Sequence, residues 1–380
     1  MSLVIRSRAP VRISFAGGGT DISPYTENYG GAVVSAAINR YAYSTFIARD
    51  DNKIILDSLD MGLRLEFNDI SEIKLDGQLD LVKSVILYFK ENHPHFFEEH
   101  GKGFEIYTSC EIPPRSGLGS SASMFASVIG IFNKLAKEYR IDNYDAAELA
   151  YHLEREKVKN PGGRQDQYIS VFGGINHIEF KGNDFVKVNS FNLKRDYILE
   201  LESNLLLLNI GQRQDSGDII DEQIKNISVN KGSLDALHET KELATIAKYA
   251  LLRGDIDSIG EILDAGWQAK KKFSGQITNQ QIDYIYSELK KVGGIGGKVT
   301  GAGGGGHLIF YCFPGKKLYV LKKALELGLK EVSFVFDHEG LTAWHSSNYE
   351  KNNTILYSRE RSSERIVSRN AYRENRAIGK

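Results

Sequence analysis

Short apolar runs alternate with turn residues over the N-terminal part of the chain. The runs are rich in Val, Ile, Phe and Tyr, and they lie at 11–15, 32–38, 43–48 and 54–56. Runs of this length and composition, separated by glycine, aspartate or asparagine, predict β-strands. A similar run at 104–110 predicts another strand. We therefore expect an N-terminal group of strands.

Three later segments have the three- and four-residue spacing of apolar positions that is typical of amphipathic helices. The first is 79–89, which precedes the strand predicted at 104–110. The second is 122–137, whose apolar stripe consists of Phe125, Val128, Ile129, Phe132 and Leu135. The third, 145–157, has to end before Pro161, because the residue before a proline disfavours the helical conformation.

The second half of the chain mixes helices and strands. The run 205–210, Leu-Leu-Leu-Leu-Asn-Ile, predicts a strand that is buried on both faces, because successive side chains point to opposite faces of a sheet. The other predicted helices are 216–226, 234–252, 256–272, 282–292 and 318–327, and the other predicted strands are 297–300, 307–313 and 332–336. This order predicts an α+β layer of helices on a sheet.

Length and polarity divide the chain further. At roughly 150 residues per domain, 380 residues predict two domains, and the polar stretch before the leucine run places their boundary near Asp196. We expect domains at 1–195 and 196–345 and a basic extension at 346–380. Residues 350–380 hold eight Lys or Arg and four Glu, a net charge of +4. A solvated tail fits this composition, and a basic arm that docks on a partner is the alternative.

The charge and cysteine content narrows the classes of protein. Lys plus Arg (48) nearly balances Asp plus Glu (49), so nucleic acid and anionic membranes are not favoured as partners. We expect a cytoplasmic protein, because the chain shows no secretory signal and no apolar run of about 18 residues that would span a membrane. Cys110 and Cys312 are the only cysteines, which excludes a disulfide framework and cysteine-based metal motifs.

Glycine is abundant, at 37 residues, and its most informative cluster lies at 113–123. This stretch, Pro-Pro-Arg-Ser-Gly-Leu-Gly-Ser-Ser-Ala-Ser, leads directly into the helix predicted at 122–137. Free amides at a helix start favour phosphate, and serine hydroxyls suit Mg²⁺, which prefers oxygen ligands. A serine-capped turn would explain an isolated Gly-x-Gly, but the Ser-Ser pair behind Pro-Pro favours a phosphate site. The stretch lacks the lysine of a Walker A loop.

A second glycine run, at 298–307, contains Gly-x-Gly-x-x-Gly at Gly301, Gly303 and Gly306. The dinucleotide-binding form of this motif requires a helix after the glycines. An apolar run typical of a strand follows here, so we reject a Rossmann fold. The run instead predicts a turn between two strands, with its backbone beside a ligand or another loop.

Charged residues accompany two other turns. Arg12 lies on the first predicted strand, and Asp21 follows a triple-glycine turn, where a carboxylate beside exposed amides is a natural partner for sugar hydroxyls. Glu154 lies on the helix predicted at 145–157, and the Gly-Gly turn after it would return Asp166 to the same site. This acidic pair would suit a metal ligand and a base.

Together these segments resemble the three signature motifs of the GHMP small-molecule kinases. Residues 113–122 match Pro-x-x-x-Gly-Leu-Gly-Ser-Ser-Ala, and 298–306 match the last motif. Galactokinases are expected to carry Gly-Glu-His-Thr-Asp-Tyr where 17–22 read Gly-Gly-Gly-Thr-Asp-Ile. Residues 15–21 (Phe-Ala-Gly-Gly-Gly-Thr-Asp), together with 163–167 (Gly-Arg-Gln-Asp-Gln) and 267–279, are similar to the D-glycero-D-manno-heptose 7-phosphate kinase branch.

The resemblance implies a two-lobed α+β fold with its active site in the cleft. Its N-terminal lobe would be like the second domain of ribosomal protein S5, and its C-terminal lobe would be ferredoxin-like. The implied enzyme uses ATP and Mg²⁺ to phosphorylate the anomeric hydroxyl of D-glycero-D-manno-heptose 7-phosphate, on the way to nucleotide-activated heptose for surface polysaccharides. The alternatives are a fucokinase-like kinase for an unphosphorylated sugar and a non-catalytic sugar and nucleotide sensor.

The resemblance also implies roles for individual residues. Asp166 would be the catalytic aspartate with Arg12 as its partner, and Glu154 would hold Mg²⁺ with Ser121 or, alternatively, Ser120. The predicted ATP-binding residues are Pro114, Arg115, Ser116, Gly117, Leu118, Gly119, Ser120 and Ser121. The predicted substrate-binding residues are Gly18, Gly19, Thr20, Asp21, Arg164, Gly303, Gly304 and Lys271. A sugar phosphate needs a second anion pocket, for which the candidates are Lys270, Lys271, Lys272, Arg164 and Arg213.

Overall fold

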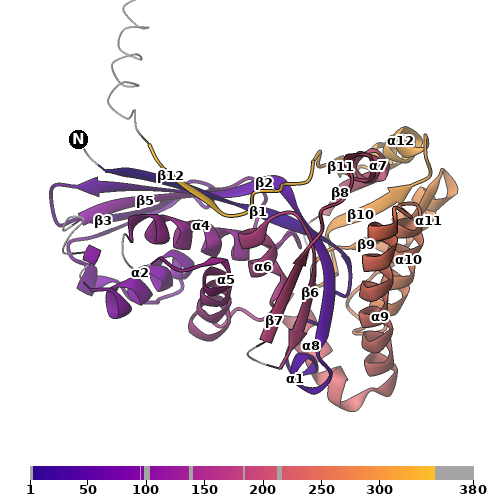
Figure 1. The fold of residues 1–380 in the computed structure, drawn as a ribbon, viewed down its shortest axis with the longest axis horizontal. Coiled ribbons are helices and arrows are strands. Elements are labelled where there is room, and N and C mark those ends of the chain that lie inside the picture. Colours follow the sequence, from indigo (N-terminus) through magenta and orange to yellow (C-terminus); the bar gives the residue numbers. More distant parts are fainter. Residues whose placement is uncertain are drawn as a thin grey trace, which may run out of the picture.

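Two β-sheets, one in each lobe, organise the chain (Figure 1). The computed structural model describes residues 3–94, 96–97, 103–136, 140–182, 185–211 and 216–346. Helices pack on each sheet, which confirms the predicted two-lobed α+β architecture. The expected boundary near Asp196 falls at the start of α7 (Arg195–Asn204) and stays a proposal. Residues 347–380, and with them nearly all of the predicted basic extension, lie outside the described residues.

The first sheet joins the start of the chain to its last described strand. Within the described residues, its strands are β1 (Val4–Ala16), β2 (Gly31–Arg49), β3 (Ile54–Ser58), β4 (Leu63–Phe67), β5 (Gly103–Cys110), β6 (Ile175–Lys181), β7 (Phe185–Ser190) and β12 (Thr342–His345). The order is β12-β1-β2-β5-β3-β4, and β6 pairs with both β2 and β7. The runs predicted as separate strands at 32–38 and 43–48 form the single strand β2, because the polar residues between them make a bulge opposite β1 rather than a turn.

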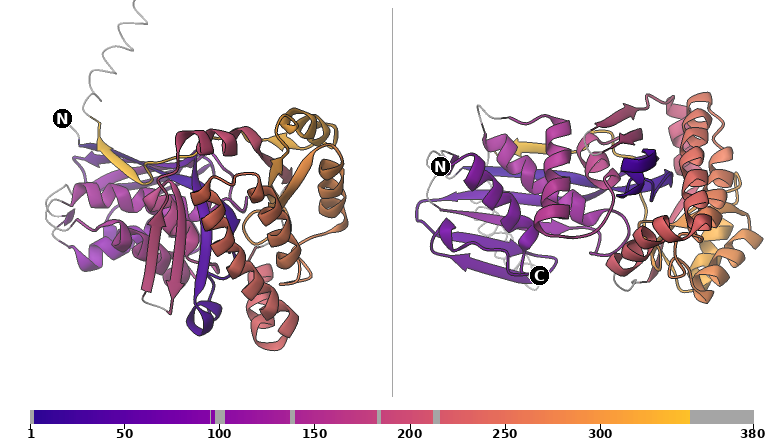
Figure 2. Two further views of the ribbon diagram at one scale, coloured as in Figure 1. Left: turned by 45° about the vertical axis from the view of Figure 1, so that its right-hand side comes forward. Right: turned by 90° about the horizontal axis from the view of Figure 1, so that it is seen from below.

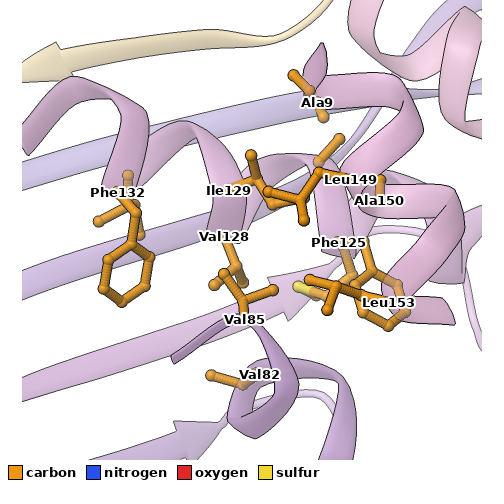
Figure 3. Close-up of a cluster of buried hydrophobic side chains, with 14 of the residues drawn as sticks. Ala9, Val82, Val85, Phe125, Val128, Ile129, Phe132, Leu149, Ala150 and Leu153 are labelled. Carbon is orange, nitrogen blue, oxygen red and sulfur yellow. The ribbon is translucent and has the colours of Figure 1, made fainter. Parts of the chain in front are cut away.

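Helices cover one face of the first sheet. Those of this lobe are α1 (Tyr25–Tyr29), η1 (Ile70–Glu72), α2 (Asp80–Asn92), α4 (Ser120–Leu135), α5 (Asn143–His152), η2 (Leu153–Lys157) and α6 (Gln165–Phe172). Figure 3 shows Phe125, Val128, Ile129 and Phe132 of the predicted stripe of α4 in one cluster with apolar side chains of α2 and α5. Leu135 belongs to the same cluster. Burying each large apolar side chain contributes about 1.5–3 kcal/mol. This core fixes the start of α4 and so the glycine loop that precedes it.

The second lobe has a smaller sheet. Its described strands are β8 (Leu205–Gly211), β9 (Gly294–Val299), β10 (Gly306–Cys312) and β11 (Lys330–Glu331), in the order β11-β8-β10-β9. Its other described helices are α8 (Ser216–Val229), α9 (Lys231–Arg253), α10 (Ser258–Lys270), α11 (Gln280–Lys291) and α12 (Lys317–Glu326). Leu205 and Leu207 pack into one apolar cluster and Leu206 and Leu208 into another, which confirms the strand buried on both faces.

The strand predicted at 332–336 is wrong. That segment forms one isolated bridge, between Ile38 and Phe336, because the chain leaves the second sheet there and crosses to the first, where β12 pairs with β1. Sequence analysis also missed several elements that are short or lack a clear apolar period: β4, β6, β7, β11, β12, α1, η1, α6 and α7. None of the described helices is long and apolar enough to cross a membrane.

The two lobes share an apolar core. Side chains of β1, including Val11, Ile13 and Phe15, belong to the same buried cluster as Leu205 of β8 and Leu263 of α10. The views in Figure 2 keep α2, α4 and α5 of the first lobe on the opposite side of the molecule from α9, α10 and α11 of the second, whereas α1 lies beside the second lobe. This continuous packing fixes the position of one lobe relative to the other.

Candidate active site

A cavity between the lobes gathers most of the residues with predicted chemical roles. Its volume is about 730 Å³, within the range of small-molecule sites. The first lobe lines it with β1, the glycine turn after β1, the start of α4 and much of the segment 154–166. The second lobe contributes Ile220, Gln223, Lys270, Lys298, Gly301 and Ala302. A ligand in this cavity therefore contacts both lobes.

The glycine loop before α4 forms one wall of the cavity. The helix begins at Ser120, and its N-cap residue Gly119 has no side chain with which to cap the first amides. These amides are consequently available to an anion. Gly119 has a φ of 78°, and a Cβ there would lie 3.2 Å from Asp166 Oδ2. Glycine at this position thus lets the loop bring its amides directly beside Asp166.

Arg12 and Asp166 form a bidentate ion pair in the cavity wall. Arg12 Nε donates to Asp166 Oδ1 at 2.7 Å, and Nη2 donates to Oδ2 at 2.8 Å. Arg12 Nη1 donates to the carbonyl of Gly117 at 2.6 Å, and the Arg12 backbone N–H donates to the carbonyl of Leu118 at 2.9 Å. Because a two-bond guanidinium–carboxylate pair fixes both groups in orientation, Arg12 ties Asp166 to the glycine loop.

Asp21 is held by the first turn of α6. Its Oδ1 accepts hydrogen bonds from the Gly19 N–H and from Gln165 Nε2, both at 3.0 Å, and its Oδ2 accepts one from the Gln165 N–H at 3.1 Å. Asp21 lines the cavity although only 3% of its surface is exposed. The turn after β1 therefore presents one carboxylate that is anchored to the helix carrying Asp166.

Glu154 lies in η2, a π-helical continuation of α5, and is 2% exposed. Its Oε1 accepts a hydrogen bond from Asn160 Nδ2 at 2.8 Å, and its Oε2 accepts one from Gln167 Nε2 at 2.7 Å. Arg155 Nη1 also lies 3.2 Å from Oε1. Glu154 is thus a buried carboxylate that several donors hold at the edge of the cavity.

The same region fits a magnesium ion. Glu154 and Ser121 line one cavity, and carboxylate and hydroxyl oxygens are ligands that Mg²⁺ prefers. The hydroxyl of Ser120 donates to the carbonyl of Pro113 at 3.4 Å, so Ser121 is the better candidate of the two. The described residues contain no cluster of three His, Cys, Asp or Glu side chains that would hold a metal alone.

The second glycine run forms the predicted turn between two strands, β9 and β10. His307 Nδ1 donates to the carbonyl of Ser116 at 2.9 Å, and a Cβ at Gly306 would lie 2.3 Å from that carbonyl. Burial lowers the pKa of His307, although its hydrogen bond to Ser116 opposes the shift. The hairpin therefore supports the glycine loop of the first lobe from behind.

Lys298 brings a buried amine from the second lobe close to Arg12. It lines the cavity, is 6% exposed, and places Nζ 3.5 Å from the hydroxyl of Ser14. Burial, reinforced by the charge of Arg12 and opposed by that of Asp21, lowers the pKa of Lys298 to about 7. Lys298 is the first residue of the last motif, and the motif alone did not indicate its function.

Among the basic residues predicted to bind a second anion, the structure separates Lys270 from the others. Lys270 lines the cavity, and its Nζ donates to the carbonyls of Val299, at 3.2 Å, and Gly301. Outside the cavity lining, Lys271 lies 3.8 Å from Asp283, Lys272 lies 3.4 Å from Glu239, and Arg164 lies over the ring of Tyr151. Arg213 lies outside the described residues.

The cavity brings together thirteen of the predicted site residues. These are Arg12, Gly18, Gly19, Asp21, Pro114, Arg115, Ser116, Gly117, Gly119, Ser120, Ser121, Glu154 and Asp166. The predicted residues outside its lining are Thr20, Leu118, Arg164, Lys271, Gly303 and Gly304. The sequence did not indicate a function for Gln165, Gln223 or Lys298. Gln165 and Lys298 lie inside the motifs at 163–167 and 298–306, and this position is the one signal that could have identified them.

Comparison with known proteins places these features in a family. The model of the GHMP kinases N terminal domain matches residues 80–174, and the model of the GHMP kinases C terminal domain matches residues 247–326. The chain is 36% identical to the D-glycero-alpha-D-manno-heptose 7-phosphate kinase of Campylobacter jejuni, over 90% of this chain and 98% of that protein. It is 26% identical to the L-fucokinase/L-fucose-1-P guanylyltransferase of Bacteroides fragilis, over 80% of this chain and 34% of that protein.

Solved structures show the same fold. A D-glycero-D-manno-heptose 1-phosphate kinase from Bacteroides thetaiotaomicron aligns with a TM-score of 0.75 and 31% identity, covering 90% of this chain and 98% of that one. A putative sugar kinase from Campylobacter jejuni aligns with a TM-score of 0.74 and 33% identity, with the same coverage. The alignments extend across both lobes of the described structure.

Proposed function

The chain belongs to the GHMP kinase family, and from this premise we propose that it transfers the γ-phosphate of ATP to the anomeric hydroxyl of D-glycero-D-manno-heptose 7-phosphate, giving the 1,7-bisphosphate. The bidentate pair of Arg12 and Asp166 beside uncapped helix amides carries this proposal. Phosphoryl transfer needs an aligned acceptor hydroxyl and compensation of the charge on the phosphate oxygens, with little covalent chemistry from the protein. The cavity offers groups for both needs.

Asp166 is the group that would align the acceptor. Its side chain is 21% exposed, and Arg12 holds both of its oxygens. The carboxylate would orient the anomeric hydroxyl and take its proton as the new oxygen–phosphorus bond forms and the bond to the leaving ADP breaks. Such a base contributes roughly 10²–10⁴ in rate. Because an anomeric hydroxyl is more acidic than an ordinary alcohol, positioning contributes more here than basicity.

The ATP phosphates would lie against the start of α4. The cationic side chains that line the cavity within the described residues are Arg12, Arg115, Arg155, Lys159, Lys270 and Lys298. They compensate phosphate charge from several directions. When bound, Mg²⁺ would offset further charge on the phosphates, with Ser121 and Glu154 as its protein ligands. Gly117 and its neighbours would supply backbone amides.

The sugar would occupy the side of the cavity formed by the glycine turn after β1. Gly18, Gly19 and Asp21 line this side, and a carboxylate accepts hydrogen bonds from sugar hydroxyls. Lys270 is the candidate for the 7-phosphate that the geometry supports best, because it combines a position in the lining with a charge suited to an ester phosphate. The Campylobacter jejuni relative, a heptose 7-phosphate kinase, supports a phosphorylated acceptor.

An ADP-release assay on a panel of sugars tests the proposal. We expect D-glycero-D-manno-heptose 7-phosphate to give the highest kcat/KM, and ³¹P–¹H coupling in the product to place the new phosphate on C1. Asp166→Asn, with nucleotide binding retained, is the negative control. A higher kcat/KM for an unphosphorylated sugar would show that this sugar, and not the heptose phosphate, is the acceptor. Efficient turnover of L-fucose in particular would favour the fucokinase-like alternative, which the Bacteroides fragilis relative supports.

A further inference from the structure

The first turn of α6 connects three carboxylates of the cavity. Asp166 is one of them, and the residues on either side of it, Gln165 and Gln167, donate hydrogen bonds to the other two, Asp21 and Glu154. Residues two positions apart on an α-helix point about 200° apart around its axis. The two glutamines therefore reach opposite sides of Asp166 from one rigid segment.

Gln165 is fixed at both ends of its amide. Its Oε1 accepts a hydrogen bond from the hydroxyl of Ser35 at 2.9 Å, which leaves Nε2 as the donor to Asp21 Oδ1 at 3.0 Å. Its own N–H donates to the second oxygen, Asp21 Oδ2, at 3.1 Å. Because Gln165 is 7% exposed, water competes little for these bonds. Both oxygens of Asp21 are thus oriented by one residue.

Gln167 supports Glu154 from behind the cavity. It is 0% exposed and does not line the cavity, and its Nε2 donates to Glu154 Oε2 at 2.7 Å. Turning the amide over would place its oxygen against the carboxylate, so this end of Gln167 has to be the donor. Asn160 holds the other oxygen of Glu154 at 2.8 Å. Glu154 therefore keeps its position without a ligand.

We propose that Gln165 and Gln167 are positioning residues with separate functions, in which Gln165 orients Asp21 for the sugar and Gln167 orients Glu154 for the metal–nucleotide complex. This inference rests on the proposed kinase function. A neutral amide suits the task, because it orients a carboxylate and leaves its charge available to the ligand. Since both glutamines belong to the turn that carries Asp166, the three carboxylates keep fixed relative positions.

Matched Gln165→Met and Gln167→Met variants test whether the two glutamines have separate functions, because methionine keeps the length of the side chain and removes the hydrogen-bond donor. Gln165→Met should raise KM for the sugar roughly ten- to a hundredfold and leave the Mg²⁺ dependence of ATP binding unchanged. Gln167→Met should raise the Mg²⁺ concentration that gives half-maximal ATP binding roughly ten- to a hundredfold and leave KM for the sugar unchanged. Calorimetry measures the ATP binding. Gln281→Met is the control, since Gln281 is exposed in the first turn of α11.

Equal effects of the two variants on sugar and on Mg²⁺–ATP would overturn the proposal and leave α6 with a structural role only. If a methionine variant does not fold, the Gln→Ala variant at the same position replaces it, because alanine also lacks a donor and introduces no steric clash, and the same difference between the two positions is expected. If the wild type phosphorylates another sugar, the heptose phosphate is not the acceptor. The effects of the two variants on KM for the sugar and on Mg²⁺-dependent ATP binding are then compared with that other sugar. If it phosphorylates none, calorimetry with Mg²⁺ and ATP still decides for Gln167, and calorimetry with the heptose decides for Gln165.

Discussion

Arg12 and Asp166 meet through two parallel hydrogen bonds of 2.7 and 2.8 Å, although 154 positions separate them in the chain. Arg12 comes from β1, the first strand of the chain, and Asp166 comes from the first turn of α6, late in the sequence of the first lobe. Since Arg12 also binds the carbonyl of Gly117, the pair orients both the acceptor side and the phosphate side of the proposed reaction.

Asp166→Asn should reduce kcat about 10²-fold or more, because the amide cannot take the proton of the acceptor. Its oxygen still accepts one hydrogen bond from Arg12, so ATP affinity should be retained. Steady-state kinetics and nucleotide calorimetry measure the two quantities. Asp235→Asn, at an exposed position of α9, is the control. A variant with undiminished kcat would remove Asp166 from the mechanism.

Lys298 should make stability depend on pH. Its pKa is lowered from 10.5 to about 7 by burial and, secondarily, by Arg12. Between these two values the unfolded chain binds a proton that the folded protein does not, so the free energy of unfolding rises with pH across this window. Lys298→Met should remove that rise. Denaturant titrations from pH 7 to pH 10 check this, with exposed Lys231→Met as the control, which should keep the wild-type slope.

Ligand binding should reverse the shift on Lys298. A polyanion in the cavity favours the charged form of the lysine, so ATP binding at about pH 8 should take up a proton in the wild type. Calorimetry in two buffers of different ionisation enthalpy measures this uptake. Lys298→Met should take up less; an identical uptake would show that another group is protonated.

Gly306→Ala should destabilise the contact between the two glycine segments. The residue has a φ of 88°, and a Cβ would lie 2.3 Å from the carbonyl of Ser116. Gly315→Ala is a matched control, since Gly315 has a φ of 76° and no atom within 4 Å of its Cβ position. Both changes cost about 1–2 kcal/mol of backbone strain, and the clash at Gly306 should add roughly 1–3 kcal/mol. Urea titration compares the two variants, and equal losses would argue against this packing.

Lys270→Met should lower the preference for a phosphorylated sugar over its unphosphorylated form. Lys270 lines the cavity, whereas Lys271 lies beside Asp283 outside the lining, so Lys271→Met should change the preference less. The ratio of kcat/KM values for the two sugars is the measurement, because a general loss of stability lowers both values together. A larger effect of Lys271→Met would restore Lys271 as the phosphate-binding residue.

Local patterns predicted much of the fold correctly. The stripe of α4 and the four leucines of β8 are strongly periodic or continuous, so their burial follows from their own side chains. The strand proposed at 332–336 failed because its course depends on pairing with a distant strand rather than on its own residues. The helix α6 was missed for a related reason. It is short, and its first turn consists of polar residues that bind carboxylates, so it shows no clear apolar period.

The sequence by itself determined the types of residue in the site and their order along the chain, because motif spacing and turn chemistry are local properties. The family resemblance already implied that Arg12 is the partner of Asp166, and the tertiary structure supplied the two hydrogen bonds between them. The tertiary structure alone decided that Lys298 is buried near Arg12, and that Gln165 binds Asp21 while Gln167 binds Glu154. Distances between side chains and the loss of hydration on burial arise only when strands and helices far apart in the chain pack together.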